Sequence, residues 1–396
     1  MTREGLCLPA TFESEVPMNF VALKMLTGDR AKYLGLIFAI AFSSFLIAHQ
    51  SSIFAGIMDR TRSQIKDITD ADIWVMDRNT QYFDEVNALT ENDLYRVRGV
   101  SGVKWAVPLF KGQPRAKAPD GKFRVVILLG LDDATLVGAP RKMTLGSAED
   151  LRRPDAAIID EAGYRFFFPN EALELGKTLE LNDHRVRIVG ISNASAPFTT
   201  FPVLFTRYSQ ALGYVGRERN LLSFVLARPE ANVPVADLTK RITDATGLKA
   251  MSGEQFGWAT IMYYIRNTGI PVNFGMTVMI ALIVGTVVAG QTFYIFTIEN
   301  LKQFGALKAI GITDLRIVGM ILLQALVVGG IGYALGMGMA ATFFAVFVHQ
   351  IQTRGIVLLP EVMAGTAVIV MFIVIVASLM SIRKVLVLEP AVVFRG

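Results

Sequence analysis

The sequence has very few of the residues that build disulfides and metal centres. Its 396 residues include one cysteine, Cys7, and three histidines, His49, His184 and His349. A single cysteine cannot form an intrachain disulfide. The histidines are far apart in the chain and have no second cysteine to join them, so we expect no metal site. Any folded part outside a membrane is then held together by its core alone.

The sequence also lacks the glycine-rich loop that binds nucleotide phosphates. That loop needs the pattern G-x-x-x-x-G-K-[ST] at the start of a helix. The Gly-Lys pairs, Gly121-Lys122 and Gly176-Lys177, have no glycine five positions before their own glycine. We therefore expect this chain to carry no cofactor and to hydrolyse no nucleotide.

Arrangements of catalytic side chains are missing as well. The spacing of serines, histidines and acids indicates no nucleophilic triad. Asp155, Asp160 and Glu161 could pair as acid and base, but they flank a predicted strand and are expected to be solvated. The sequence therefore predicts a protein without an enzyme active site.

Charged residues are scarce and apolar residues are abundant. The chain is 18% charged and 52% hydrophobic, with a mean hydropathy of +0.44. About 20 apolar residues in a helix cross the roughly 30 Å hydrocarbon core of a bilayer. Four stretches reach that length, at about 33–57, 272–298, 317–348 and 362–382. Residues 58–271 are too charged to enter a bilayer, so they predict a folded aqueous domain.

Basic residues near the span ends predict the orientation, because they stay on the cytoplasmic side. Basic residues occur in three stretches: before the first span (Lys24, Arg30 and Lys32), between the second and third spans (Lys302, Lys308 and Arg316), and after the fourth span (Arg383, Lys384 and Arg395). The loop at 349–361 has only Arg354. We expect 1–32, 299–316 and 383–396 to be cytoplasmic, and 58–271 and 349–361 to face outward. The net charge of +5 is then explained by span ends, so we expect no nucleic-acid binding.

The amino terminus shows no signal peptide, because MTREGLCLPATFESEVP has no continuous apolar core. We expect the first span to direct the chain to the membrane. Met18 is an alternative to Met1 as the start of translation.

The aqueous domain is predicted to be α+β. Strand patterns occur in ADIWVMD, VKWAVPL, FRVVILLGL, AAIID, FPVLFTR and LLSFVLAR, and TLELNDHRVRIVGI indicates a hairpin that turns at NDH. Helices are predicted at ENDLYRVRGV and at VADLTKRITDATG, where Gly247 is a natural stop. Two half-units at the ends of the domain enclose a β-rich subdomain at about 110–207. The fold class is a membrane protein with four transmembrane α-helices and a large extracytoplasmic α+β domain of two subdomains.

Both edges of this domain have a helical character and lead into spans. Trp258, Tyr263 and Tyr264 suit a membrane interface, where an aromatic ring is half solvated. One interpretation is simple anchoring; the other is a stalk that transmits motion between the membrane and the domain.

The segment ENLKQFGALKAIGITDLR at 299–316 predicts a short cytoplasmic helix between two spans. Glu299 favours the helix start, Gly311 a stop, and Thr313 the start of the next helix. Apolar residues recur on one side at three-residue steps, at Leu301, Phe304, Leu307 and Ile310. Such a segment either lies on the inner leaflet or presents an apolar knob to a partner.

Two spans carry unusual residues. The first has several polar residues, with Ser43, His49 and Gln50 as possible substrate contacts; the alternative is a polar cluster at the outer interface. The third contains Gly332 and Gly336, a G-x-x-x-G face that permits close helix packing. Packing within one subunit and packing between two copies are both open.

The run from Glu299 to Gly336, which begins ENLKQFG and ends YALG, resembles the segment between the second and third spans of FtsX/MacB-type ABC transporter permeases. The matching residues are Glu299, Gly305, Lys308, Ala309 and Gly311, and the ending RKVLVLEPAVVFRG matches through Pro390 and Arg395. Looser matches in AHQSSIFAGIMDRTRSQIKDITDADIWVMD, VVILLGLD, AAIIDEAG and RVRIVGI look closest to the DevC-type subgroup.

The resemblance implies a permease of the bacterial inner membrane that dimerises and binds two cytoplasmic ATPase subunits, which hold the ATP and Mg²⁺. The coupling residues would be Glu299, Phe304, Gly305, Lys308, Ala309 and Gly311. A periplasmic membrane-fusion adaptor and an outer-membrane channel are further implied partners. MacB carries its own ATPase, and this chain departs from it there.

The leading hypothesis is export of a lipid or other amphiphile, since four spans show no pattern of a wide polar channel. Substituting Phe304 or Gly305 is then expected to uncouple hydrolysis from transport and leave the fold intact. One alternative is a mechanotransmitter that regulates a periplasmic cell-wall hydrolase. Another is lipoprotein extraction by a permease heterodimer.

Overall fold

The structure is a computed structural model that describes residues 18–118, 120–215, 221–347 and 354–387. The chain divides into two compact units. The helical unit comprises Met1–Ser52, Asn273–Val346 and Leu358–Gly396, and the α+β unit comprises Ile53–Val272 and Phe347–Val357. Each unit is described by itself.

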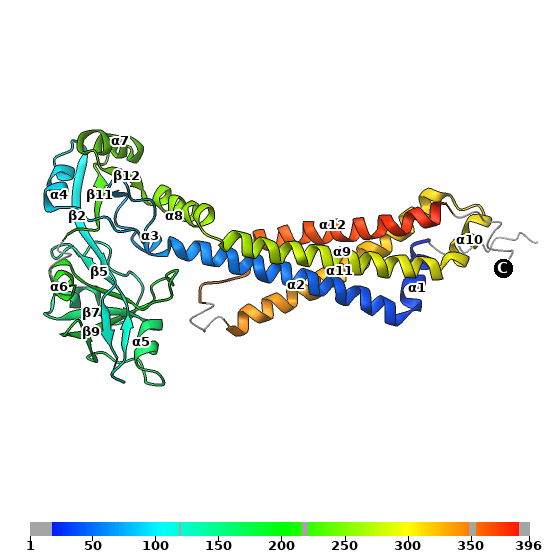
Figure 1. The fold of residues 1–396 in the computed structure, drawn as a ribbon, viewed down its shortest axis with the longest axis horizontal. Helices are drawn as coiled ribbons and strands as arrows, with labels where there is room; N and C mark the ends of the chain where they lie inside the picture. Colours follow the sequence, from blue (N-terminus) through cyan, green and yellow to red (C-terminus); the bar gives the residue numbers. More distant parts are fainter. Residues whose placement is uncertain (1–17, 119, 216–220, 348–353, 388–396) are drawn as a thin grey trace, which may run out of the picture. The chain divides into compact units, whose positions relative to one another are not determined.

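The helical unit is built around four long apolar helices (Figure 1). They are α2 (Arg30–Thr61), α9 (Ile270–Glu299), α11 (Asp314–Phe347) and α12 (Pro360–Leu386). Two shorter helices accompany them, α1 (Met18–Gly28) and α10 (Leu301–Ala309). The four long helices cover the four predicted spans and are long and apolar enough to cross a membrane. Where a bilayer begins and ends along them stays a prediction.

The helical unit has a buried apolar core and an apolar exterior. Ile40 of α2, Phe293 of α9 and Ile373 of α12 are buried in one cluster. On α9, large apolar side chains also face outward, including Met276 and Ile280, which are 54% and 59% exposed. Exposure of large apolar side chains along a whole helix is costly in water and suits a surface that contacts lipid.

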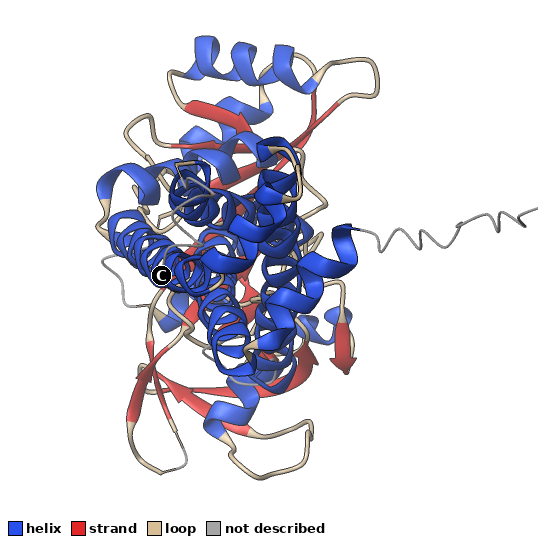
Figure 2. Cartoon of the chain, turned by 90° about the vertical axis from the view of Figure 1, so that its right-hand side faces the viewer, coloured by secondary structure: helices blue, strands red, loops and turns tan. Residues whose placement is uncertain are grey.

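The α+β unit contains the strands of the chain (Figure 2). The strands are β1 (Ile73–Met76), β2 (Val103–Gly112), β3 (Arg115–Lys117), β4 (Phe123–Val125), β5 (Ile127–Leu131), β6 (Met143–Leu145), β7 (Ala156–Asp160), β8 (Thr178–Leu181), β9 (His184–Ser192), β10 (Val203–Arg207), β11 (Phe224–Pro229) and β12 (Lys249–Ser252). The helices are α3 (Ser63–Asp67), α4 (Glu91–Arg98), α5 (Glu161–Phe167), α6 (Tyr208–Tyr214), α7 (Val235–Thr246) and α8 (Gly253–Asn267), with a 3₁₀ turn, η1 (Ala148–Arg152).

One strand, β2, joins two subdomains. Its first part pairs with β11, in the order β12-β1-β11-β2, and strands from both ends of the unit meet there. From Phe110 to Gly112, β2 pairs with β5, and the order continues β5-β10-β7-β9-β8-β3-β4. The second subdomain therefore consists of strands from within the stretch between Phe110 and Arg207. The predicted fold class, with a β-rich subdomain inserted between two half-units, is confirmed.

Local signals in the sequence correctly placed several elements. Asn182 and Asp183 have φ of 44° and 66°, and the flanking residues pair in the β8–β9 hairpin. Positive φ at both central residues defines the two-residue hairpin turn that matches the twist of a sheet. Helix α7 ends at Gly247, whose φ is 70°. Strands β3, β6 and β12 were not predicted, because runs of three or four residues are too short to show an alternating pattern.

The helical edges of the α+β unit pack on its own core. Helix α8 places Tyr264 at 8% exposure, where its hydroxyl donates to Asp84 Oδ2 at 3.0 Å. The Tyr263 ring stacks on Tyr82 with centroids 3.9 Å apart. Only Trp258 stays half exposed, beneath the guanidinium of Arg62. Tyr264 is thus buried within the unit and Tyr263 is half buried against Tyr82, while their place relative to a membrane stays a prediction.

Candidate functional site

Helix α10 lies between the ends of α9 and α11, where the coupling segment was predicted. It ends beside Gly311, whose φ of +95° is a conformation that favours glycine. Helix α11 then begins at Asp314, directly after Thr313. The predicted stop at Gly311 is confirmed, but Glu299, which was expected to favour the start of this helix, is the last residue of α9, and α10 begins at Leu301 without a side-chain cap.

The apolar side of α10 is buried against its own chain. Phe304 is fully buried in a cluster with Ile317 and Ile321 of α11 and Ile382 and Val385 of α12. Gly305 is buried as well. The expected apolar knob is therefore not a free surface at Phe304. The burial of Phe304 argues against the expectation that its substitution leaves the fold intact, because truncating a buried phenylalanine costs about 3–5 kcal/mol.

Two lysines tie the ends of this segment to neighbouring helices. Glu299 forms an ion pair with Lys32, which also contacts Asp29 at 2.8 Å. Lys308 pairs with Asp314 at 2.8 Å and donates to the carbonyl of Leu386 at 3.2 Å. The Lys308 side chain is 9% exposed and that of Asp314 is 57% exposed, so solvent still screens this pair from one side. Glu299 and Lys308 therefore position the segment.

The exposed apolar residues of the segment flank the turn at Gly311. Ile310 is 80% exposed and Leu315 is 81% exposed. Ala309 is exposed beside them. Leu315 was missed by the sequence analysis, because it lies outside the three-residue repeat of α10. These two large apolar side chains can meet either the inner leaflet or a partner.

The glycine pair of α11 packs on α2 of the same chain. A Cβ at Gly332 would lie 2.7 Å from Ile40 Cγ2. A Cβ at Gly336 would lie 2.5 Å from the Ala41 carbonyl oxygen and 2.6 Å from Ser44 Cβ. The close approach therefore takes place within one subunit.

The predicted substrate contacts of α2 do not form one site. Ser43 is 2% exposed and lies against Gly285 of α9. His49 instead packs among the rings of Phe45, Phe343 and Phe344, with centroids 5.4, 4.6 and 5.8 Å away. Gln50 is half buried. The contacts of Ser43 are those of helix packing.

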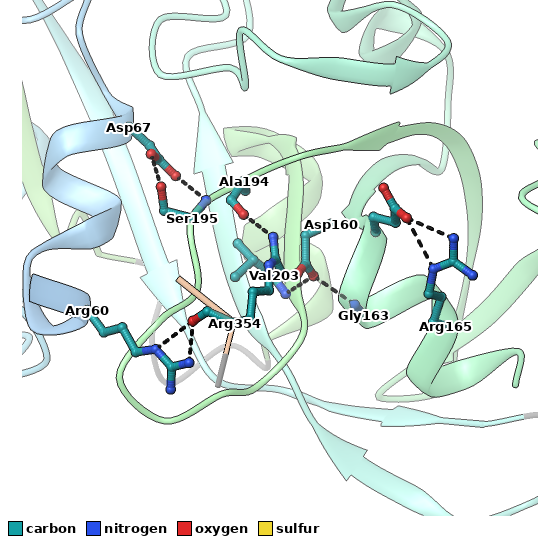
Figure 3. A network of polar contacts seen from close by, with 10 residues as sticks. Arg60, Asp67, Asp160, Gly163, Arg165, Ala194, Ser195, Val203 and Arg354 are labelled. Carbon is teal, nitrogen blue, oxygen red and sulfur yellow. Dashed lines mark hydrogen bonds and ion pairs between the residues drawn. The ribbon is translucent and has the colours of Figure 1, made fainter. Parts of the chain in front are cut away.

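A second arrangement, which we call the loop junction, lies inside the α+β unit and consists of Arg60, Asp160 and Arg354 (Figure 3). The guanidinium of Arg354, from the connection between α11 and α12, donates to Asp160 Oδ2 at 2.7 Å and to the carbonyl of Ala194. Arg60, near the end of α2, donates through Nε to the Arg354 carbonyl at 3.1 Å. The junction therefore joins three separate parts of the chain.

Asp160 is the buried centre of the loop junction. It ends β7 and caps α5, where Oδ1 accepts from the amides of Gly163 at 3.2 Å and Val203 at 2.9 Å. The residue is 1% exposed, so the expectation that it is solvated is wrong. Burial raises the pKa of its carboxyl, while Arg354 and the two amides oppose that rise. The exposed Asp155 and the Glu161–Arg165 pair fit the solvated expectation.

Helix α3 is tied to the same region by a second contact. Asp67 of α3 accepts from the Ser195 amide at 2.8 Å and from the Ser195 hydroxyl at 2.7 Å. Ser195 adjoins Ala194, whose carbonyl Arg354 contacts. Within the described ranges, no group of three metal-ligating side chains is assembled. His349, Pro390 and Arg395, which entered the sequence analysis, lie outside the described residues.

Four long apolar helices, with an α+β unit inserted in the chain between the first and the second of them, define a multi-pass membrane protein. Residues 34–245 match the MacB-like periplasmic core domain family, and residues 275–390 match the FtsX-like permease C-terminal family. The chain therefore belongs to the FtsX/MacB-type permeases of ABC transporters.

Curated relatives agree with this family. Two sequences from strains of Mycobacterium tuberculosis, each named an uncharacterized ABC transporter permease, are 29% identical over 227 residues. The alignments cover 56% of this chain and 58% of each relative. The chain thus spans less than two thirds of the length of the curated relatives it matches.

Solved structures show more distant similarity. The periplasmic region of MacB from Actinobacillus actinomycetemcomitans is 18% identical, with a TM-score of 0.36, over 52% of this chain and 96% of that one. The extracellular domain of the transporter YknZ from Gram-positive bacteria is 16% identical, with a TM-score of 0.34, over 46% and 98%.

Proposed function

We propose that this chain is the permease subunit through which a separate cytoplasmic ATPase dimer moves the α+β unit. The carrying observation is the construction of the coupling segment. Phe304 fixes α10 to α11 and α12, while Ile310 and Leu315 remain exposed beside it. A partner that displaces this turn would displace the bases of two long helices, because a close-packed cluster transmits strain.

The loop junction is the proposed receiver of that displacement. Helix α11 runs unbroken from Asp314, beside the coupling segment, to Phe347. The chain then reaches Arg354, whose guanidinium is fixed on Asp160. The contact of Arg354 with Asp160 is the proposed receiver because it fixes a residue that follows α11 in the chain to the β-rich subdomain.

We further propose export of a lipid or other amphiphile from the bacterial inner membrane. A permease homodimer would pass it to a periplasmic membrane-fusion adaptor and an outer-membrane channel. The large apolar side chains exposed along α9, α11 and α12 support this proposal, because they offer contact with lipid. We also propose that both termini and residues 299–316 lie on the cytoplasmic side of that membrane.

The test is mass spectrometry of gently solubilised complexes isolated through this chain. Wild type is expected to recover an ATPase subunit together with a membrane-fusion adaptor. Ile310→Asp and Leu315→Asp are expected to lose the ATPase and keep the adaptor. Leu175→Asp, at a side chain 46% exposed in the α+β unit, is the matched control and is expected to keep both.

The outcomes separate the candidate functions. A wild-type chain that recovers no ATPase would refute the coupling role. An ATPase recovered with a cell-wall hydrolase or its activator would refute export in favour of mechanotransmission. A second, unequal permease in the complex would refute the homodimer in favour of lipoprotein extraction.

A further inference from the structure

A cavity of about 400 Å³ opens in the β-rich subdomain beside the loop junction. Its walls come from β4, from α5 and from residues 196–202, which precede β10. The volume lies within the roughly 300–1,000 Å³ typical of small-molecule sites. The site is therefore large enough for a compact ligand.

The walls of this cavity are mainly apolar and partly aromatic. The principal apolar residues are Phe123, Val125, Ala162, Phe166, Phe201 and Pro202. Phe123 and Phe166 are 61% and 40% exposed, although both are large aromatic side chains. Apolar walls with exposed aromatic rings favour a ligand with an apolar body.

A cation with an unused donor lies at the same cavity. The guanidinium of Arg124 is placed over the Phe166 ring, 5.0 Å from its centroid. The Nε of Arg124 is buried and has no hydrogen-bond partner among the described residues. Its Nη2 contacts Asp120 at 3.3 Å, in a pair exposed enough to be weak. A buried donor left unpaired is costly, so an acceptor on a ligand would relieve that cost.

The charges that line the cavity favour an anion. Arg124 and Arg354 are cationic, and Asp160 is the one acid among the lining residues. Both oxygens of Asp160 are already occupied, by two amides and by Arg354. A carboxylate or phosphate is the group that a guanidinium binds best.

We propose that this cavity binds an anionic amphiphile, with its apolar body among the phenylalanines and its acidic group on Arg124. This proposal rests on the proposed function, for which it names the substrate class and one binding site. Because Asp160 and Arg354 line the cavity and also form the loop junction, the occupant touches the contact that holds the connection between α11 and α12.

The test measures binding to the full chain in lipid nanodiscs without any partner. The probes are octanoate, octanol and octylammonium, which share one chain and differ in head group. Saturation-transfer NMR, with empty nanodiscs subtracted, gives the bound fraction. Octanoate is expected to bind, and octylammonium is expected to bind at least about tenfold more weakly, a 1.4 kcal/mol difference.

Three variants locate the site. Ala162→Phe fills the cavity without removing a polar group and is expected to abolish octanoate binding. Arg124→Gln is expected to weaken it about tenfold, and Arg124→Lys to restore part of the loss. Arg185→Gln changes an exposed arginine of β9 outside the cavity and is expected to leave binding unchanged.

Unchanged octanoate binding in Ala162→Phe, or equal binding of the three probes, would overturn the proposal. Thermal unfolding followed by tryptophan fluorescence checks that each variant is folded, because all three tryptophans belong to the α+β unit. The measurement needs no ATPase. A negative result therefore rejects the ligand site in this cavity and leaves the proposed coupling role unaffected. The isolation of complexes by mass spectrometry tests the coupling role separately.

Discussion

Replacing Arg354 with glutamine is expected to leave the Asp160 carboxylate buried without its cationic partner. Asp160 is 1% exposed and the Arg354 side chain is 20% exposed. Removing one member of such a pair costs about 3–5 kcal/mol, mostly because the remaining charge is left uncompensated. Glutamine keeps a polar side chain of similar length, so the change mainly removes charge.

Protonation limits this cost. At pH 7 a carboxyl with an ordinary pKa near 3.9 is neutralised for roughly 4 kcal/mol, at about 1.36 kcal/mol per pKa unit. The amides of Gly163 and Val203 still donate to Oδ1, so they keep part of the stabilisation. We therefore expect a loss of about 2–4 kcal/mol, which lowers the Tm of a unit of this size by about 4–16 °C.

The assay is thermal unfolding of the full chain by tryptophan fluorescence, at pH 7 and at about pH 5. The pKa of Asp160 is raised by burial, and loss of Arg354 removes a cause that lowers it. The folded state then holds its proton to a higher pH than the unfolded state, so stability falls as pH rises toward the folded pKa. The deficit of Arg354→Gln is expected to be largest at pH 7 and smaller at pH 5.

Two results would refute this reasoning. The first is a Tm at pH 7 equal to that of Arg185→Gln, the exposed control. The second concerns the double variant Asp160→Asn/Arg354→Gln, in which asparagine keeps an oxygen for the two amides. This variant is expected to regain much of the loss; no recovery would mean that the loss came from loop packing and not from the buried charge.

Gly336→Ala is expected to destabilise the helical unit by about 1–3 kcal/mol, because its Cβ would meet the backbone of α2. The control Gly338→Ala adds a Cβ in open space and is expected to stay within about 1 kcal/mol of wild type. Thermal loss of helical circular dichroism compares the two variants, and equal unfolding midpoints would contradict the close packing of Gly336 on α2. Phe304→Ala is expected to lower the stability of the helical unit by about 3–5 kcal/mol and to reduce ATPase recovery through misplacement of α10; recovery at the wild-type level would contradict this. Lys111→Met is expected to lower the stability of the α+β unit by about 1–3 kcal/mol, because Lys111 is only 4% exposed and pairs with Asp84. Thermal unfolding followed by tryptophan fluorescence gives the Tm, and a Tm equal to that of wild type would contradict this expectation.

Local signals were sufficient for much of the fold. Asn182 and Asp183 specify their turn by tolerating positive φ, and Gly247 ends α7 for the same reason. The division of the α+β unit could be predicted because a helix followed by a strand occurs near each of its ends, with a β-rich stretch between them. The role of β2 in joining the two subdomains could not be predicted, because a strand that pairs with two different partners has the same sequence pattern as any other long strand.

The position of the coupling segment in the chain could be predicted from the sequence, but which of its side chains are buried and which are exposed could not. Three-residue spacing placed Phe304 on one side of α10, but spacing does not reveal what covers that side. The cluster of Phe304 with Ile317 and Ile382 covers it, and leaves Ile310 and Leu315 exposed. The glycine face of α11 was likewise evident from Gly336, and its partner was not.

The sequence by itself determined the four apolar helices, the inserted α+β unit and the short helix at Leu301–Ala309, because length, hydropathy and turn preference act over neighbouring residues. Only the tertiary structure decided the loop junction and the burial of Asp160. Arg354 lies 194 residues from Asp160 in the chain, and a carboxylate after a strand reads as solvated until the fold removes its water and supplies its cation.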